Sequence, residues 1–144
     1  MHADDAPHVT QLLPDLGYSA TVPDIQERLA TLMARPEQGI FVAEQGGVIV
    51  GLSHVYGVRL LASYGFAEVG ELVVALPFQR KGVGRLLMYA VESWASQHAY
   101  ARVRLRSGIH REDAHQFYER LGYERSRASF AFERRLPIPT NRSP

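Results

Sequence analysis

The sequence contains no cysteine, which excludes disulfides, thiolate metal sites and cysteine nucleophiles. Lysine is nearly absent too, because Lys81 is the only lysine among 16 basic residues. No apolar run approaches the ~20 residues of a membrane-spanning helix. The first residues lack the basic start and apolar stretch of a signal peptide. We therefore expect a cytoplasmic protein without a membrane segment.

The composition is that of an ordinary globular domain. The 144 residues are 46% hydrophobic and 22% charged, which is too apolar for a disordered chain. The net charge of +1 hides an asymmetry: residues 1–100 carry 6 basic and 10 acidic side chains, whereas residues 101–144 carry 10 and 5. A basic end can indicate nucleic-acid binding, but solvated strand and helix faces explain it better, so nucleic acid is an unlikely partner.

The hydrophobic pattern predicts one domain over residues 1–136, with a polar tail over 137–144. Its predicted helices cover residues 4–16, 21–35, 83–95 and 113–121. Its predicted strands cover residues 39–44, 48–61, 67–75, 102–106 and 128–136. The first three strands follow one another through short turns, which favours an antiparallel meander. We expect an α/β domain with a mainly antiparallel sheet.

The segment between the third strand and the long helix is suited to binding an anion. Gly82 and Gly84 leave the backbone N–H groups at the helix start unobstructed, and the helix dipole favours negative charge there. Four further side chains add donors or positive charge around this point: Gln79, Arg80, Lys81 and Arg85. We therefore predict a pyrophosphate cradle. It matches neither the phosphate loop of nucleotide hydrolases nor a dinucleotide fingerprint.

Two motifs resemble those of the GNAT superfamily of acyl-CoA-dependent N-acetyltransferases. Gln79-Arg80-Lys81-Gly82-Val83-Gly84 is similar to the Gln/Arg-x-x-Gly-x-Gly/Ala motif, and it follows a Leu-x-Val strand at Leu72 and Val74. The segment 114–123 is similar to the Ala-x-x-Phe-Tyr-x-x-x-Gly-Phe/Tyr signature. The residues of this segment resemble those of a bacterial branch of the family that includes aminoglycoside-acetyltransferase-like members. The resemblance extends from about Asp4 to Leu136.

The resemblance implies a GNAT-like sheet with helices on both faces, and acetyl-CoA as co-substrate without a metal. It implies direct acetyl transfer to a primary amine of a small molecule or peptide, with the Val74 N–H facing the acetyl oxygen. The pantetheine arm would lie in a V-shaped gap between residues 72–74 and 103–107. The implied coenzyme-binding residues are Leu72, Val73, Val74, Gln79, Arg80, Lys81, Gly82, Val83, Gly84, Arg85 and Arg111.

Three residues are candidates for proton transfer. The resemblance points Tyr118 at the thioester sulfur as the acid, although a packed core tyrosine is the alternative. Glu68 and Glu71 are both candidate bases. Strict alternation puts them on opposite faces of the strand, but a bulge, which the family often has here, would change that. The side chains of His54, Tyr56 and Tyr64 are further candidates for lining the acceptor pocket, or else they are ordinary surface or core residues.

The sequence departs from the family pattern in two places. The strand that usually precedes the first helix is not found here, so either it is absent or the true start lies upstream. We expect the neighbouring sheet edge to be short or covered by a second chain in a homodimer. Arg111 occupies a position where the family commonly has asparagine. The change either removes one side-chain contact to the pantetheine arm or lets the arginine reach a phosphate instead. A non-catalytic acyl-CoA sensor is the alternative function. The acceptor stays open among aminoglycosides, polyamines, amino acids, peptide N-termini and lysine side chains.

Overall fold

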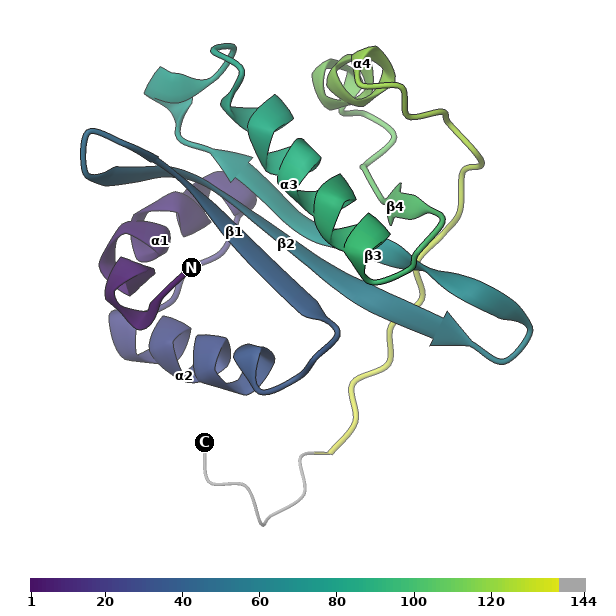
Figure 1. The fold of residues 1–144 in the computed structure, drawn as a ribbon, viewed down its shortest axis with the longest axis horizontal. Helices are drawn as coiled ribbons and strands as arrows, with labels where there is room; N and C mark the ends of the chain where they lie inside the picture. The colour runs from purple at the N-terminus through teal and green to yellow at the C-terminus, as the bar shows by residue number, and fades with distance from the viewer. Residues whose placement is uncertain (138–144) are drawn as a thin grey trace. The chain divides into compact units, whose positions relative to one another are not determined.

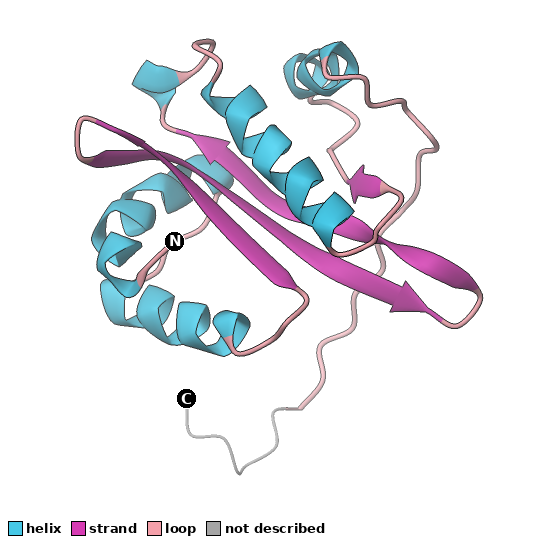
Figure 2. Cartoon of the chain, in the orientation of Figure 1, coloured by secondary structure: helices cyan, strands magenta, loops and turns pink. Residues whose placement is uncertain are grey.

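The computed structural model describes residues 1–137, which divide into two compact units, one of Met1–Arg106 and one that starts at Ser107. Figures 1 and 2 show the elements. The first unit contains η1 (Ala3–Asp5), α1 (Ala6–Leu12), η2 (Leu13–Leu16), α2 (Val22–Met33), β1 (Gln38–Gln45), β2 (Val48–Leu60), β3 (Ser63–Val74), η3 (Leu76–Phe78), α3 (Val83–Gln97) and β4 (Val103–Leu105). The second contains α4 (Glu112–Arg120). The prediction of one domain over residues 1–136 stays a prediction.

Four strands form one mixed, mainly antiparallel sheet in the order β1-β2-β3-β4. β1, β2 and β3 pair antiparallel, as the predicted meander requires, and β4 lies parallel to β3. The parallel pairing is brief, because only Ala67–Val69 have partners on β4. The predicted α/β fold class is therefore confirmed.

The two faces of this sheet are covered by different helices. Gly39 and Gly51 face α3 so closely that a Cβ atom would come within 2.9 Å of Trp94 or Leu87. The alternate residues, such as Leu52, belong to the core formed with α1 and α2. Figure 1 shows α3 over the strands on one side and α1 and α2 at the left and lower left, on the other side.

Local signals set the ends of the first helices as expected. Thr21 and Asp24 form a reciprocal capping box at the start of α2, with the Thr21 N–H donating to the Asp24 carboxylate over 2.8 Å. Gly17 ends the first helical segment with a left-handed φ of 79°. These contacts satisfy backbone groups that a helix terminus leaves unpaired.

The predicted strand over residues 128–136 is wrong, because the chain has no regular structure there. Phe130, Phe132 and Leu136 are 88%, 96% and 74% exposed. An alternating pattern becomes a strand only where a partner strand supplies a ladder, and α4 is the one regular element described in this second unit. The predicted tail lies outside the described residues apart from Pro137.

The structure agrees with the missing first strand. Within residues 1–137 no strand precedes α1, and β1 is an edge strand of the sheet. Coverage of this edge by a second chain in a homodimer stays a prediction. No helix among the described residues is long and apolar enough to cross a membrane.

Candidate active site

The open edge of β3 is the first part of the site. Pairing with β4 ends at Val69, and no other strand among residues 1–137 lies beside the five residues that follow on that side of β3. On its other side, the Ala75 N–H donates to the Val50 carbonyl of β2 over 2.8 Å. Because antiparallel residues alternate in the direction of their hydrogen bonds, the N–H groups of Val74 and Leu72 point toward the open edge. The V-shaped gap expected beside this edge stays a prediction.

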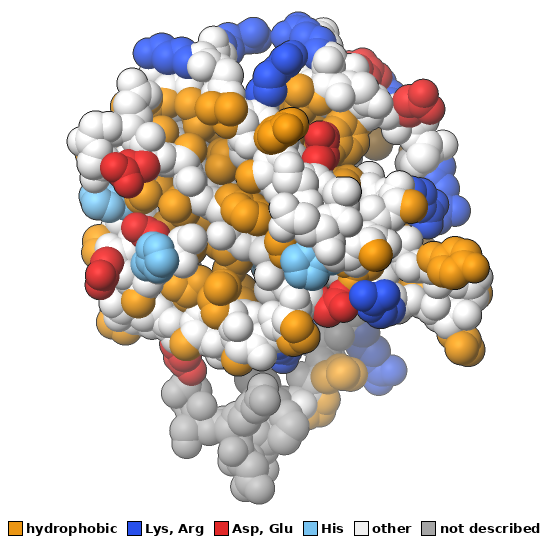
Figure 3. All heavy atoms as spheres, viewed as in Figure 1, with side chains coloured by type: hydrophobic (Ala, Val, Ile, Leu, Met, Phe, Trp, Pro, Cys, Tyr) orange, Lys and Arg blue, Asp and Glu red, His pale blue; other side chains and the backbone are white. Residues whose placement is uncertain are grey.

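The start of α3 is the second part. Gly82 is its N-cap residue with a left-handed φ of 84°, and no atom lies within 4 Å of where its Cβ would be. The Leu86 N–H bonds to the Gly82 carbonyl over 3.1 Å, so the three preceding helix N–H groups have no partner within the helix. Lys and Arg side chains gather over this η3–α3 loop (Figure 3). The arrangement is that of an anion-binding helix terminus.

The loop is tied to the end of β3. The Gln79 side-chain amide donates to the Val74 carbonyl over 3.0 Å, and the Lys81 ammonium lies 5.8 Å from the centre of the Phe78 ring. Arg80 adopts a positive φ of 60°, which lets the chain turn sharply before the helix. Gln79 therefore connects the loop before α3 to the end of β3.

A β-bulge brings both candidate bases to one face. His54 pairs with Glu71 and Tyr56 with Glu68, while Gly70 is the extra residue between these rungs. Cross-strand partners share a face, and residues two apart on β2 do so as well. Glu68 and Glu71 therefore lie on the same face as His54 and Tyr56. The face is the one packed by α1 and α2.

His54 is held by a neighbour on each side. Its Nε2 lies 2.6 Å from the Gln38 amide oxygen, and its Nδ1 lies 3.8 Å from the Glu71 carboxylate. With Gln38 accepting, Nε2 carries the proton and Nδ1 keeps its lone pair. Burial lowers the pKa of His54, and the charge of Glu71 opposes that shift. The imidazole is thus kept neutral beside a carboxylate that is 41% exposed.

Glu68 differs from Glu71 in its partners. Its side chain is only 8% exposed, and its two oxygens lie 2.8 Å from Arg104 Nε and 3.7 Å from Arg106 Nε. The Glu68 carboxylate is therefore held by two arginines, whereas that of Glu71 lies beside His54. Both arginines pair with a carboxylate of this same chain, which argues against the hypothesis that this basic segment binds nucleic acid.

Three more of the predicted residues, Tyr64, Tyr118 and Arg111, have surroundings of their own. Tyr64 is fully exposed near the β2–β3 turn, so it lines no pocket. Tyr118 and Arg111 belong to the second unit, where the Tyr118 ring lies 5.1 Å from that of Phe117. Burial raises the pKa of Tyr118, and the Arg111 charge opposes it. The contribution of Gln38 went unpredicted, since only the strand register places it beside His54.

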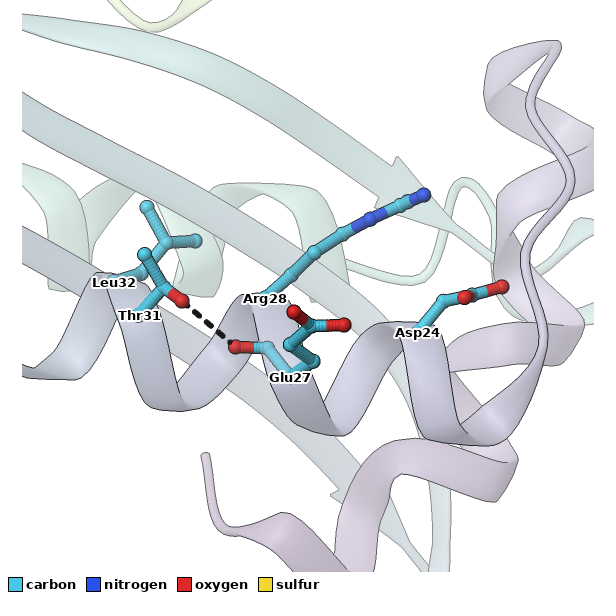
Figure 4. Close-up of a pocket in the computed structure, with 5 residues that line it drawn as sticks. All are labelled: Asp24, Glu27, Arg28, Thr31 and Leu32. Carbon is cyan, nitrogen blue, oxygen red and sulfur yellow. Dashed lines mark hydrogen bonds between the residues drawn. The ribbon is translucent and has the colours of Figure 1, made fainter. Parts of the chain in front are cut away.

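A shallow hollow lies elsewhere, on the surface of α2. It is lined by Asp24, Glu27, Arg28, Thr31 and Leu32, which all come from that one helix (Figure 4). The Thr31 hydroxyl donates back to the Glu27 carbonyl over 3.0 Å. All the residues that line it come from one helix, so it is not an enclosed ligand cleft.

Comparison with known proteins finds similar sequences. The family model described as "Acetyltransferase (GNAT) family" matches residues 9–123, which span both units. An aminoalkylphosphonate N-acetyltransferase from Salmonella typhimurium is 29% identical over 81% of this chain and 73% of its own length. Uncharacterized N-acetyltransferases from Methanocaldococcus jannaschii and Bacillus subtilis are 32% and 36% identical over 65% and 38% of this chain. The matches to these two span only 42% and 39% of their lengths.

Solved structures share the fold at low identity. A GNAT family acetyltransferase from Staphylococcus aureus has a TM-score of 0.76 at 20% identity, covering 91% of this chain and 90% of its own. The protein AAC(6')-Iy, solved in complex with the bisubstrate analog CoA-S-monomethyl-acetylneamine, has a TM-score of 0.82 at 16% identity, with 94% and 95% covered. At these identities the likeness concerns the fold.

Proposed function

Because this chain belongs to the GNAT family of acetyltransferases, we propose that it transfers the acetyl group of acetyl-CoA to a primary amine of a small molecule. The observation that carries the proposal is the open edge of β3, which leads into the uncapped N–H groups at the start of α3. An extended, amide-containing arm that ends in a pyrophosphate has the chemistry for both parts.

The residues at the start of α3 fit a pyrophosphate. The empty space at the Gly82 Cβ position lies beside three unpaired N–H groups, and Arg80, Lys81 and Arg85 add positive charge. Along the open edge, the N–H groups of Leu72 and Val74 are the donors for the pantetheine arm. Val73 points its hydrogen bonds to β2, so it supports the strand rather than the coenzyme.

The Val74 N–H is the group that stabilises the transferred carbonyl. Negative charge develops on the acetyl oxygen as the amine attacks, and a fixed backbone donor stabilises that charge without reorganising. Attack on the thioester is direct, and no side chain of this chain is acylated. The bond between the carbonyl carbon and sulfur then breaks, and the thiolate leaves.

Two proton transfers complete the reaction. His54 Nδ1 accepts the proton of the acceptor ammonium, directly or through one water, and the imidazolium that results faces the Glu71 carboxylate at 3.8 Å. Glu71 and Gln38 orient the ring. Tyr118 is the acid for the thiolate, since a raised pKa keeps its phenol protonated at neutral pH, so that a proton is available when the thiolate forms.

The acceptor class follows the named relatives. One of them acts on aminoalkylphosphonates, and fold neighbours are aminoglycoside acetyltransferases solved with amine-derived ligands. The group around His54 consists of polar side chains from three strands, with Gln38 on β1, His54 on β2 and Glu71 on β3. We therefore place small-molecule amines ahead of peptides as acceptors.

Binding of acetyl-CoA is tested by substituting two glycines that share a conformation. Gly82 and Gly46 both have a positive φ, 84° and 61°, with nothing within 4 Å of the Cβ position. Alanine costs each a similar strain of about 1–2 kcal/mol. By calorimetry, Gly82→Ala should weaken acetyl-CoA binding at least tenfold, whereas Gly46→Ala should leave it unchanged. Equal affinities in both variants contradict the pyrophosphate site.

Turnover separates the enzyme from the sensor. A panel of primary amines is incubated with acetyl-CoA, and free thiol is measured as it is released. Thiol release that depends on the amine supports the transferase. Tight acetyl-CoA binding with no release on any amine overturns it and supports the non-catalytic sensor.

A further inference from the structure

The face that carries His54 and Glu71 also carries arginines from β4 and the residues that flank it. Arg104 pairs in register with Glu68, so both side chains lie on that face. Arg102 and Arg106 lie just outside β4, and their contacts with Phe66 and Glu68 bring them to the same place. Arg104 lies 3.8 Å from the centre of the Phe66 ring, and Arg102 lies 5.7 Å from it. Stacking on the ring holds these guanidinium groups in place.

The charge of this group is not balanced. The guanidinium groups of Arg104 and Arg106 share one carboxylate, that of Glu68. Arg104 donates to Glu68 through Nε over 2.8 Å, and Arg106 approaches it through Nε at 3.7 Å, so the terminal NH₂ groups of both are not the atoms nearest to Glu68. Their side chains are 39% and 68% exposed, so a solute can reach them. The group is therefore suited to a carboxylate, phosphonate or phosphate.

The distance between these arginines and the proposed base, His54, limits the length of a ligand that could reach both. The rung of His54 and Glu71 lies two β2 residues from the rung of Tyr56 and Glu68, which is roughly 7 Å along the strand. The arginines lie one strand farther across, by roughly 5 Å, and their side chains reach back to Glu68. An amine near His54 and an anion on Arg106 are then separated by the length of a short aliphatic chain.

We propose that the acceptor is a short primary amine with an anionic group at its other end, whose amine lies at His54 and Glu71 while Arg104 and Arg106 bind the anion. This inference rests on the proposed acetyl transfer and names its substrate class. Glu68 positions the two arginines in this arrangement. The shared chemistry covers amino carboxylates and amino phosphonates alike.

The test compares three acceptors with the same three-carbon spacing, 3-aminopropylphosphonate, 4-aminobutyrate and 3-aminopropanol, with cadaverine as a dication. We expect kcat/KM for at least one of the anionic amines to exceed that for 3-aminopropanol by roughly tenfold to a hundredfold, the range for a charge-assisted hydrogen bond. The more efficient of the two anionic amines identifies the anion. In Arg106→Gln the ratio should fall toward one.

Arg59→Gln is the matched control. Arg59 is also an arginine of this sheet, but it pairs with Glu37 over 2.9 Å and lies 5.1 Å from the Tyr100 ring. Its substitution should keep the wild-type ratio. The inference is overturned if 3-aminopropanol or cadaverine is as good an acceptor as both anionic amines, or if the preference survives in Arg106→Gln. If no amine is acetylated at all, the proposed function itself fails, and this inference with it.

Discussion

Removing the Val74 N–H tests the open edge of β3 most directly. Val74→Pro deletes this one donor, and the register shows that the ladder to β2 does not use it, because the neighbouring Ala75 N–H makes the bond to Val50. The substitution should therefore leave the sheet paired. Its effect on stability comes from the fixed φ of proline rather than from a lost ladder bond.

The expected loss is catalytic. A single oxyanion donor contributes about 2.7–4 kcal/mol to the transition state, which at 1.36 kcal/mol per tenfold is roughly a hundredfold to a thousandfold in kcat. Acetyl-CoA affinity should fall far less, since the Leu72 N–H and the α3 terminus still bind the coenzyme. Steady-state rates of thiol release give kcat, and calorimetry gives the affinity.

Two controls accompany this variant. Val74→Ala removes most of the side chain but keeps the N–H, so its kcat should stay within a few-fold of wild type. Replacing Val74 by its α-hydroxy acid removes the N–H without introducing a ring. This second variant is used if circular dichroism shows that the proline variant does not fold. A folded variant that lacks the N–H yet keeps kcat within threefold of wild type refutes the role of Val74.

Two further predictions concern the proton-transfer groups. His54→Gln should lower kcat by roughly a hundredfold to ten-thousandfold and remove the acid limb of the kcat/KM profile, which in wild type should lie below pH 6.5 because burial lowers the pKa of His54. Because the pKa of His54 is lower in the folded protein, the unfolded chain binds the proton more readily, so the free energy of unfolding should fall as pH drops below 6.5. The fall should be smaller in His54→Gln, and urea titrations at several pH values measure it. An equal dependence of the free energy on pH in both proteins contradicts the lowered pKa of His54. Tyr118→Phe should lower kcat by at least tenfold with acetyl-CoA affinity unchanged, and a kcat equal to wild type in thiol-release assays excludes Tyr118 as the acid.

The candidate site illustrates which inferences local sequence supports. The pattern at Gly82 and Gly84 predicts an accessible helix start, and the structure has one, because φ and N-terminal N–H groups depend on neighbouring residues alone. The choice between Glu68 and Glu71 is different. Alternation alone separates them, and the bulge at Gly70 that unites them depends on how β3 aligns with β2. The partnership of His54 with Gln38 depends on register for the same reason.

The sequence by itself determined the elements of this protein: the helices and their caps, the meander, and the glycine-rich turn before α3. These follow from periodicity and from side chains that reach only a few residues along the chain. Tertiary structure alone decided which strand edges stay unpaired and which carboxylate meets a histidine or an arginine. It also decided that the alternating segment 128–136 forms no strand. Pairing needs a partner that is distant in sequence, and no local pattern specifies whether that partner is present.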